Sequence, residues 1–598
     1  MATTGIYFGG RTIKIPGAYA VGDASDLIEV NVSALNVVML IGSSQGGKPN
    51  TPLFFNSANQ AKALSMLRGG PLYMAAQAAW GASNTEGVNA ADVIICLRVD
   101  PATQAVNSFI DEQTTPALAF DVLARDWGKH GNGNQVQILA GANNAALRRI
   151  SIKKIEDSVN QVSPDLGEVL TIAYTGNGTA SVQVHAVAGV PTLDVAVTGA
   201  TDGTAGFSIA LDSAAVDTLQ KLAAFISGQT GYNVKLLGGS TIPSVQLDPM
   251  ATPAVLASAG VKLLAVNGAC VDWINRYSVS CIATFRGNAA HVAIAGPVFL
   301  AGGADGVPSL TNWQSGMRKL ETEPGYFLVP CTGDPLVHAA GLDHVIRMSD
   351  VKVKRRRVMY AGHEVGDVVF SPDGTVNYAN LADRVFALNS ARVVFATPGI
   401  QEQVNGTVQT FGSWLLAAKL AGLKAGNKPQ ESLTFKYVRT LGLEGDFDTA
   451  TQEQIIDTAA TQVVKVPNKG FRVVLGQCAQ LRTTNVIESE PSVLHCADTL
   501  LTNLETFLEE KYTGVPAAGN IQLILASIKK DCENIGKQAE ALGMIVSGYV
   551  NGQLKPALTV NRVSFANRTY AIDLSAALSE PGNYITVMAH WQAVEGAV

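Results

Sequence analysis

The sequence has few charged residues, and its charge is almost balanced. Only 15% of its 598 residues are Asp, Glu, Lys or Arg, against about a quarter in a typical soluble domain. The net charge of −6 lacks the positive balance that nucleic-acid-binding proteins show. Few charges leave less solvated surface than a free monomer of this length shows. The composition therefore favours a protein that is partly covered by copies of itself.

Several signals of membrane, secreted and catalytic proteins are missing. No run of eighteen apolar residues predicts a membrane span, and the N-terminus lacks the basic-then-apolar layout of a signal peptide, so we expect folding in a cytoplasm. The seven cysteines form no CxxC pair, which excludes zinc ribbons and thioredoxin-like motifs. The histidines show no metal-binding spacing, and there is no GxSxG elbow or HExxH motif. We therefore predict no catalytic residue, no metal ligand and no cofactor.

One segment resembles a phosphate-binding loop. Residues Gly42 to Lys48 follow the apolar run Asn36–Gly42 and match the front of the GxxxxGK pattern. The next residue is Pro49, where that loop needs Ser or Thr for magnesium. Proline also removes a backbone N–H from the phosphate cradle. We expect a glycine-rich turn that does not bind nucleotide, so a nucleotide-binding α/β enzyme is the weaker alternative.

A basic run covers residues Val351 to Val358, with five Lys or Arg among eight residues. Such a run binds phosphates in some proteins. It is also typical of a charged helix end or strand edge that meets acidic neighbours. The negative net charge favours a protein–protein role over nucleic acid.

Hydrophobic periodicity predicts an α/β core. The buried-strand runs Asn36–Gly42 and Asp92–Val99 flank two helical segments, at 59–67 and 72–80. This βαβ order predicts parallel pairing. The same alternation returns near residue 255, with strands at 279–285, 292–300, 326–329, 358–360 and 391–396 and helices at 263–275, 310–320, 335–348 and 411–425.

Two stretches differ from this core. From Asn134 to about Leu236 the chain alternates with period two and is rich in Thr, Val and Gly, with one helix at 214–226. The last hundred residues read as two helices, at 493–510 and 517–542, followed by three strands. The prediction is a multi-domain α/β fold, mixed α+β overall. It comprises an N-terminal arm at 1–25, a core at 26–145 and 251–490, an inserted β-rich outer domain at 146–250, and a C-terminal domain and arm at 491–598.

Both ends of the chain read as strands with no element beyond them. Open strand edges pair with other chains unless something covers them. We therefore predict inter-subunit arms. Their residues are Ile6, Phe8, Ile13 and Ile15 near the start, and Tyr584, Ile585, Thr586, Val587 and Met588 near the end.

Two cysteines are candidates for an inter-subunit disulfide. Cys532 lies in a charged helical stretch, 529–534, that we expect to reach solvent, where nearby lysines favour the thiolate. Cys478 is the second candidate. The alternative is that all seven cysteines are free thiols, mostly buried.

A series of short motifs, taken in order, resembles the tail sheath proteins of contractile bacteriophage tails and related injection machines. The series covers nearly the whole chain except residues 146 to 250. Its members are Pro16–Tyr19, Trp127–Asn134, Phe299–Gly306 with Trp313, Val329–Thr332, Asn389–Val393 with Pro398 and Gly399, Ala417–Gly422, Leu433–Lys436 and Gly442–Glu444.

This resemblance implies a structural subunit and not an enzyme. Its partners would be copies of itself in stacked hexameric rings, the tail tube protein, and baseplate and tail terminator proteins, with no nucleic acid and no direct membrane insertion. The sheath would belong to the virion and assemble in the bacterial host cytoplasm. Its arms would add strands to neighbouring subunits while the cores rotate as rigid bodies during genome ejection. Residues near the C-terminal domain would face the tube, and the inserted domain would project outward. The alternative within this class is another self-assembling tube or shell protein.

Overall fold

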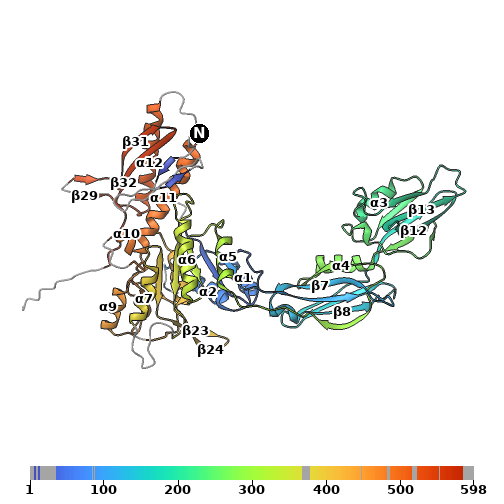
Figure 1. Ribbon diagram of the computed structural model, residues 1–598, viewed down its shortest axis with the longest axis horizontal. Helices are drawn as coiled ribbons and strands as arrows, with labels where there is room; N and C mark the ends of the chain where they lie inside the picture. The colour runs from blue at the N-terminus through green and yellow to red at the C-terminus, as the bar shows by residue number, and fades with distance from the viewer. Residues whose placement is uncertain are drawn as a thin grey trace, which may run out of the picture. The chain divides into compact units, whose positions relative to one another are not determined.

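The computed structural model describes residues 6–8, 11–13, 35–83, 85, 88–366, 378–445, 447–480, 485–514, 521–550 and 553–583. The chain forms two compact units, whose elements are labelled in Figure 1. The core unit comprises Met1–Ser44, Pro49–Asp100 and Val307–Val598. The inserted unit comprises Gln45–Lys48 and Pro101–Gly306. The fold is therefore mixed α+β and multi-domain, as predicted.

The core unit is built on a nine-stranded sheet, in the order β25-β28-β27-β22-β21-β20-β3-β5-β4. Its strands are β3 (Val38–Gly42), β4 (Leu53–Asn56), β5 (Val93–Arg98), β20 (Phe327–Pro330), β21 (Val358–Gly362), β22 (Val393–Thr397), β25 (Tyr437–Val438), β27 (Thr461–Val466) and β28 (Gly470–Val473). The six strands from β27 to β5 are parallel, and antiparallel strands close both edges. All residues of β3, β21 and β22 are buried. These strands read as continuous apolar runs because helices cover both faces of a parallel sheet.

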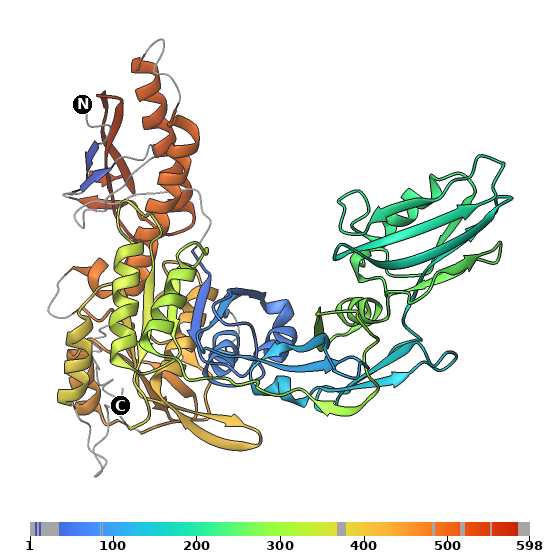
Figure 2. The same ribbon diagram turned by 45° about the vertical axis from the view of Figure 1, so that its right-hand side comes forward.

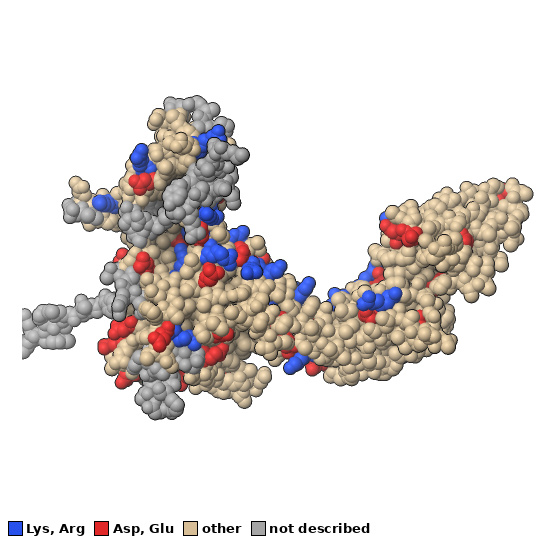
Figure 3. All heavy atoms as spheres, viewed as in Figure 1, with Lys and Arg blue, Asp and Glu red and all other residues tan. Residues whose placement is uncertain are grey.

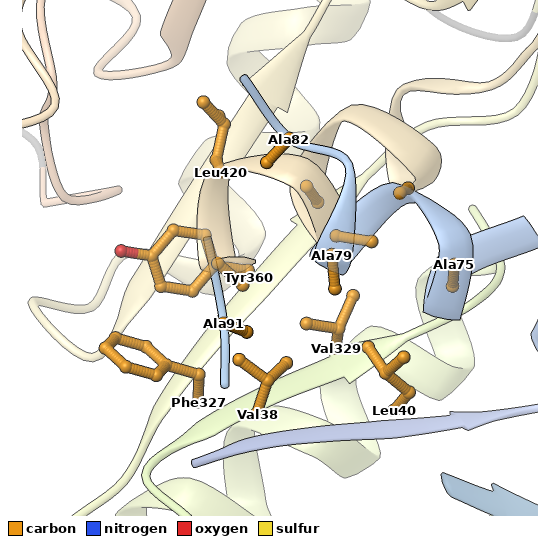
Figure 4. Packing of buried hydrophobic residues seen from close by; sticks show 14 of the residues in the cluster. Val38, Leu40, Ala75, Ala79, Ala82, Ala91, Phe327, Val329, Tyr360 and Leu420 are labelled. Atoms are coloured by element: carbon orange, nitrogen blue, oxygen red, sulfur yellow. The ribbon is translucent and has the colours of Figure 1, made fainter. Parts of the chain in front are cut away.

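Alternate residues of β3 pack into two separate hydrophobic layers. Val38 and Leu40 face α2 (Pro71–Trp80) and α8 (Ser413–Gly426), and Figure 4 shows this layer. Met39 and Ile41 face the opposite layer. Its helices are α5 (Leu310–Leu320), α6 (Pro335–Met348), α7 (Tyr378–Leu388) and α9 (Thr449–Asp457).

Smaller elements of the core unit surround this sheet. Helix α1 (Gln60–Leu67) follows the 3-10 turn η1 (Ser57–Asn59) and packs on the first layer. A separate sheet has the order β24-β23-β26. Its strands are β23 (Ile400–Val404), β24 (Thr407–Phe411) and β26 (Gly442–Leu443). Near the N-terminus, β1 (Ile6–Phe8) and β2 (Arg11–Ile13) pair as an antiparallel hairpin.

The C-terminal part of the core unit has its own hydrophobic cluster. After the short helix α10 (Val486–Ser489), this part contains α11 (Pro491–Tyr512), α12 (Ile521–Ala541) and two hairpins. The first hairpin joins β29 (Gly548–Val550) to β30 (Gln553–Lys555), and the second joins β31 (Leu558–Ala566) to β32 (Thr569–Ala576). In Figure 2 the β31–β32 hairpin lies beside α12. We call this part, residues 491–583, the C-terminal domain.

The inserted unit consists of two lobes. The first contains the sheets β18-β7-β6 and β10-β9-β8-β19 around helix α4 (Val266–Tyr277). Its strands are β6 (Gln104–Ile110), β7 (Leu118–Trp127), β8 (Gln135–Ala140), β9 (Arg148–Lys154), β10 (Val159–Val162), β18 (Cys281–Phe285) and β19 (Ala295–Phe299). The 3-10 turn η2 (Lys129–Gly133) joins β7 to β8.

The second lobe contains the sheets β15-β11-β17 and β14-β13-β12-β16, packed on α3 (Leu219–Ser227). Its strands are β11 (Glu168–Tyr174), β12 (Thr179–Val187), β13 (Val190–Thr198), β14 (Phe207–Ala210), β15 (Tyr232–Leu236), β16 (Ala254–Leu256) and β17 (Val261–Leu264), and η3 (Ser244–Gln246) is a short 3-10 turn. On the face seen in Figure 3, this lobe carries few charged side chains. That surface accounts for part of the chain's low charge content.

The structure corrects the predicted bounds of the insertion. The inserted unit runs from Pro101 to Gly306, whereas the sequence predicted 146–250 and assigned the flanking residues to the core. Strands β6, β7, β8, β18 and β19 complete the sheets of the first lobe, so they belong with it. Residues 127–134, which lead to the predicted start of the alternating region at Asn134, connect β7 to β8 inside the unit. The two ends of the inserted unit lie next to each other, since the Thr103 N–H donates to the Ala304 carbonyl at 2.9 Å.

Candidate assembly site

Helix α11 belongs to two hydrophobic cores. Leu494, near its start, packs in the layer under the nine-stranded sheet. Leu500 and Leu504, further along, pack in the cluster of the C-terminal domain. Because hydrogen bonds run along the whole axis of a continuous helix, α11 links the sheet to the C-terminal domain as one stiff element.

One face of α11 carries a polar stripe that meets the basic run. The stripe has the spacing i, i+4, i+7, i+11, which places its members on one helix face. Its members are Asp498, Thr502, Glu505 and Glu509. Arg356 donates to both carboxylate oxygens of Glu505, at 2.6 and 3.1 Å, and to the Thr502 hydroxyl at 3.2 Å. Lys354 lies 3.2 Å from Glu509.

Asp498 is the centre of this contact. Its carboxylate is buried and accepts two hydrogen bonds from Arg392, at 2.6 and 2.9 Å, and one from the Tyr326 hydroxyl at 2.9 Å. The Arg356 Nε lies 3.7 Å away. Burial and the Asp498 charge raise the pKa of Tyr326 well above its usual value. Burial is the largest single influence on the pKa of Arg392 and lowers it, but the charge and hydrogen bonds of Asp498, together with smaller effects of Tyr326 and Cys478, outweigh burial and raise this pKa above its usual range.

The basic run is therefore engaged inside the chain. Besides the contacts of Lys354 and Arg356, the buried Arg357 donates to His344 Nε2 at 2.7 Å and to the Leu320 and Glu323 carbonyls at 2.8 Å each. Lys354 and Arg356 meet acidic side chains, as one interpretation of the run expected, whereas Arg357 meets a histidine and backbone carbonyls. Sequence reasoning did not find the partners, because α11 lies some 150 residues further along. The acidic spacing on α11 was the one local signal.

The last described residue of the chain lies next to the start of α11. Glu490, which precedes this helix, is buried and accepts hydrogen bonds from Ser492 at 2.8 Å and Ser432 at 3.0 Å. Its second oxygen accepts from the Asn583 side chain at 3.4 Å. Burial raises the pKa of Glu490, and the Ser492 and Ser432 hydrogen bonds act against it. Asn583 is the last described residue, so the root of the predicted C-terminal arm is attached where sheet and C-terminal domain meet.

The β31–β32 hairpin has two strand edges without a partner among the described residues. It forms a sheet of two strands only, with one face against the α12 cluster. A two-stranded hairpin is marginally stable alone. Its free backbone donors and acceptors are a template for further strands. Strand addition to this hairpin would therefore stabilise it.

The predicted arm residues are only partly described. Ile6 and Phe8 lie in β1 and Ile13 in β2, and Ile6 is paired with Ile13. Ile15 lies outside the described residues. The same is true of Tyr584, Ile585, Thr586, Val587 and Met588. Strand character at the N-terminus is therefore observed, and pairing between chains stays a prediction.

The predicted solvent access of Cys532 is wrong. Its side chain is fully buried, because α12 turns Cys532 toward the cluster of Leu500 and Leu504 and its charged neighbours outward. Cys478 is buried too, and burial raises the pKa of its thiol well above the usual value. An inter-subunit disulfide at either position stays a prediction, which would require these thiols to become accessible.

The Gly42–Lys48 segment differs from a phosphate-binding loop in its structure as well as its sequence. The Ser44 N–H donates to the buried Asp100 carboxylate at 2.9 Å. An amide that would face a phosphate therefore already binds an acidic group. The next element is strand β4, whereas a phosphate-binding loop opens a helix.

Two further surveys concern only the described residues. No three His, Cys, Asp or Glu side chains there are grouped so that they could hold a metal ion. No helix in the same ranges is both long and apolar enough to cross a bilayer.

Comparison with known proteins bears on the motifs. No family model matches the chain. The chain is 24% identical to the tail sheath protein of Bacillus phage SP01, over 98% of this chain and 97% of that protein. It is also 24% identical to the tail sheath protein of Staphylococcus phage Twort, over 90% and 93%. The solved sheath tail protein of Listeria innocua shares the fold, with a TM-score of 0.51 at 11% identity over 92% and 94%. The resemblance indicated by the motifs is confirmed: the chain is related, along nearly its whole length, to phage tail sheath proteins.

Proposed function

We propose that this chain is the structural subunit of a contractile tail sheath. It polymerises as a helical array around a tail tube, and contraction of the array drives the tube through the host envelope during genome delivery. The observation that carries this proposal is the similarity to named tail sheath proteins over 98% and 90% of the chain. A match of that extent includes both units and the C-terminal domain.

Strand exchange links the subunits in this proposal. The N-terminal and C-terminal segments of neighbours add strands to the β31–β32 hairpin, whose edges are open among the described residues. Main-chain hydrogen bonds then hold subunits together while side chains at other contacts change partners. The attachment of Asn583 to Glu490 supports this role, since it fixes the origin of the C-terminal arm.

The array consists of stacked hexameric rings, with the tail tube protein inside and baseplate and terminator proteins at its ends. The C-terminal domain faces the tube, and the inserted unit faces outward. The sheath assembles in the host cytoplasm and becomes part of the virion. Subunits act without catalysis or cofactor, because a metastable extended lattice releases energy as contacts between rigid subunits increase.

Deletion of residues 582–598 tests the strand exchange. We expect the truncated protein to remain folded, with the melting temperature of the full chain, and to form no tubes by negative-stain electron microscopy. A matched control replaces Val587 and Ile585 with Thr, which keeps strand propensity and should preserve tubes. Full-length tubes from the truncated protein would contradict the exchange.

A further inference from the structure

We propose that Arg356 and Arg392 are positioning residues that make the C-terminal domain turn together with the nine-stranded sheet. This inference rests on the proposed sheath function, because coupling matters only if subunits rotate. It concerns a joint within the core unit, between the strand starts and α11. Sheet and C-terminal domain each have their own hydrophobic cluster, and α11 contributes side chains to both.

The joint is a three-point contact with three neighbouring strands. Tyr326 directly precedes β20, Arg392 directly precedes β22, and Arg356 lies two residues before β21. These strands are adjacent and parallel in the sheet. Their N-terminal ends therefore lie side by side, and each presents one donor to α11. The three donors meet α11 at two places, Asp498 and Glu505, which lie about two helical turns apart. Two attachments separated along the axis fix both the position and the direction of a helix, which a single contact does not.

The chemistry of the contact resists sliding. Arg392 binds Asp498 with two parallel hydrogen bonds, and Arg356 binds Glu505 in the same way. Two-point guanidinium–carboxylate pairs have a fixed geometry, whereas apolar contact is non-directional. Asp498, Glu505 and Arg356 are buried. A shift of α11 by one turn would leave these charges unpaired away from water, which is strongly unfavourable.

The joint lies between the hairpin and the sheet. The β31–β32 hairpin and α12 share one hydrophobic cluster with the second half of α11. A force applied to the hairpin by a neighbour's strand therefore reaches α11 first. From α11 it reaches the strand starts through Asp498 and Glu505. In a contracting lattice this path converts a pull on the linked domains into rotation of the whole core unit.

Hydrogen exchange on the full-length, unassembled protein tests the coupling directly. With increasing urea, the slowest amides of α11 and α12 should converge on the same exchange rate as those of β20, β21 and β22, because coupled parts open together. Rates that stay more than tenfold faster in α11 and α12 would overturn the proposal. This comparison uses the natural sequence, so it does not depend on the folding of a variant.

A charge swap tests the role in contraction. Arg356→Glu places a carboxylate against Asp498 and Glu505, and we expect tenfold faster exchange in α11, assembly into long tubes, and loss of shortening. Arg356→Glu combined with Glu505→Arg should restore both the slow exchange and the shortening. Arg318→Glu, at an exposed position of α5, is the matched control and should behave as the natural chain.

The opposite results are equally distinct. Normal shortening by an Arg356→Glu protein whose α11 exchanges fast would overturn the proposal, and so would a folded double variant that fails to shorten. If the natural chain forms no tubes at all, the sheath function fails, and the exchange comparison still decides whether the joint is rigid.

Discussion

Replacement of Asp498 by Asn should measurably destabilise the core unit. The substitution keeps the side-chain size but removes the charge that faces Arg392, whose side chain is only 21% exposed. Breaking a buried ion pair by removing one partner costs about 3–5 kcal/mol. Arg392 keeps some solvent access, so we expect about 3 kcal/mol. An unfolding entropy of about 2.1 cal/mol/K per residue, over the roughly 390 residues of the core unit, converts this loss into a melting-temperature decrease of about 4 °C.

Differential scanning calorimetry of the full chain measures this decrease. The matched control is Asp343→Asn on α6, whose side chain is 80% exposed and lies 3.9 Å from Arg347. Exposed pairs of this kind contribute about 0–1 kcal/mol, so the control should shift the melting temperature by about 1 °C or less. The inserted unit does not contain Asp498, so any transition of its own should stay in place. Equal shifts for Asp498→Asn and Asp343→Asn would refute the assignment of Asp498 as the centre of the joint.

Four further predictions follow from particular residues. Burial lowers the pKa of His338 to about 4, so the folded chain does not bind the proton that the unfolded chain takes up below about pH 6.5. The contribution of this residue to the free energy of unfolding is therefore complete above that pH and falls toward pH 4, by about 2.5 kcal/mol at pH 4.5. Urea titrations of His338→Gln should lack that part of the acid sensitivity. Excision of residues 101–306 with a short Gly/Ser linker should leave a soluble core unit that still assembles, because Thr103 and Ala304 are hydrogen-bonded neighbours; only insoluble protein would count against it. ATP should not raise the melting temperature, and Lys48→Ala should not change assembly; a ligand at a hundred times its dissociation constant would stabilise by about 2.7 kcal/mol, so a rise of several degrees would contradict the assignment of the Gly42–Lys48 turn. Non-reducing gels of purified particles should show reductant-sensitive multimers if Cys532 or Cys478 links subunits, and a single monomer band ends that hypothesis.

The sequence predicted the elements whose signal is local. Strands β3, β21 and β22 are continuous apolar runs because both faces of the sheet are covered, and α5 and α6 carry their own start signals. Ser309 caps α5, and Asp334 followed by a proline opens α6. These predictions needed no knowledge of distant residues. The helix predicted at 214–226 instead begins at Leu219, where Thr218 supplies the cap.

The errors concern contacts between distant segments. The insertion was predicted too short because β7 pairs both with its neighbour β6 and with β18, which returns some 160 residues later. The basic run alone did not indicate that its partners lie on α11. The charged neighbours of Cys532 suggested an exposed side chain, whereas this residue faces the core side of its helix. The β23–β24 hairpin had a readable signal that was missed, since Asn405 and Gly406 form its two-residue turn. Asp498 and Glu505 were missed because acidic residues on one helix face indicate solvent as readily as a buried partner.

Electron microscopy of assembled tubes before and after a contraction trigger, such as mild heat or urea, tests the central claim most directly. The sheath account predicts two populations built from the same subunit, one long and narrow and one short and wide. The interconversion should occur without proteolysis or added nucleotide. Tubes or shells whose length and width stay the same under all conditions would contradict contraction. They would favour a static self-assembling tube or shell protein.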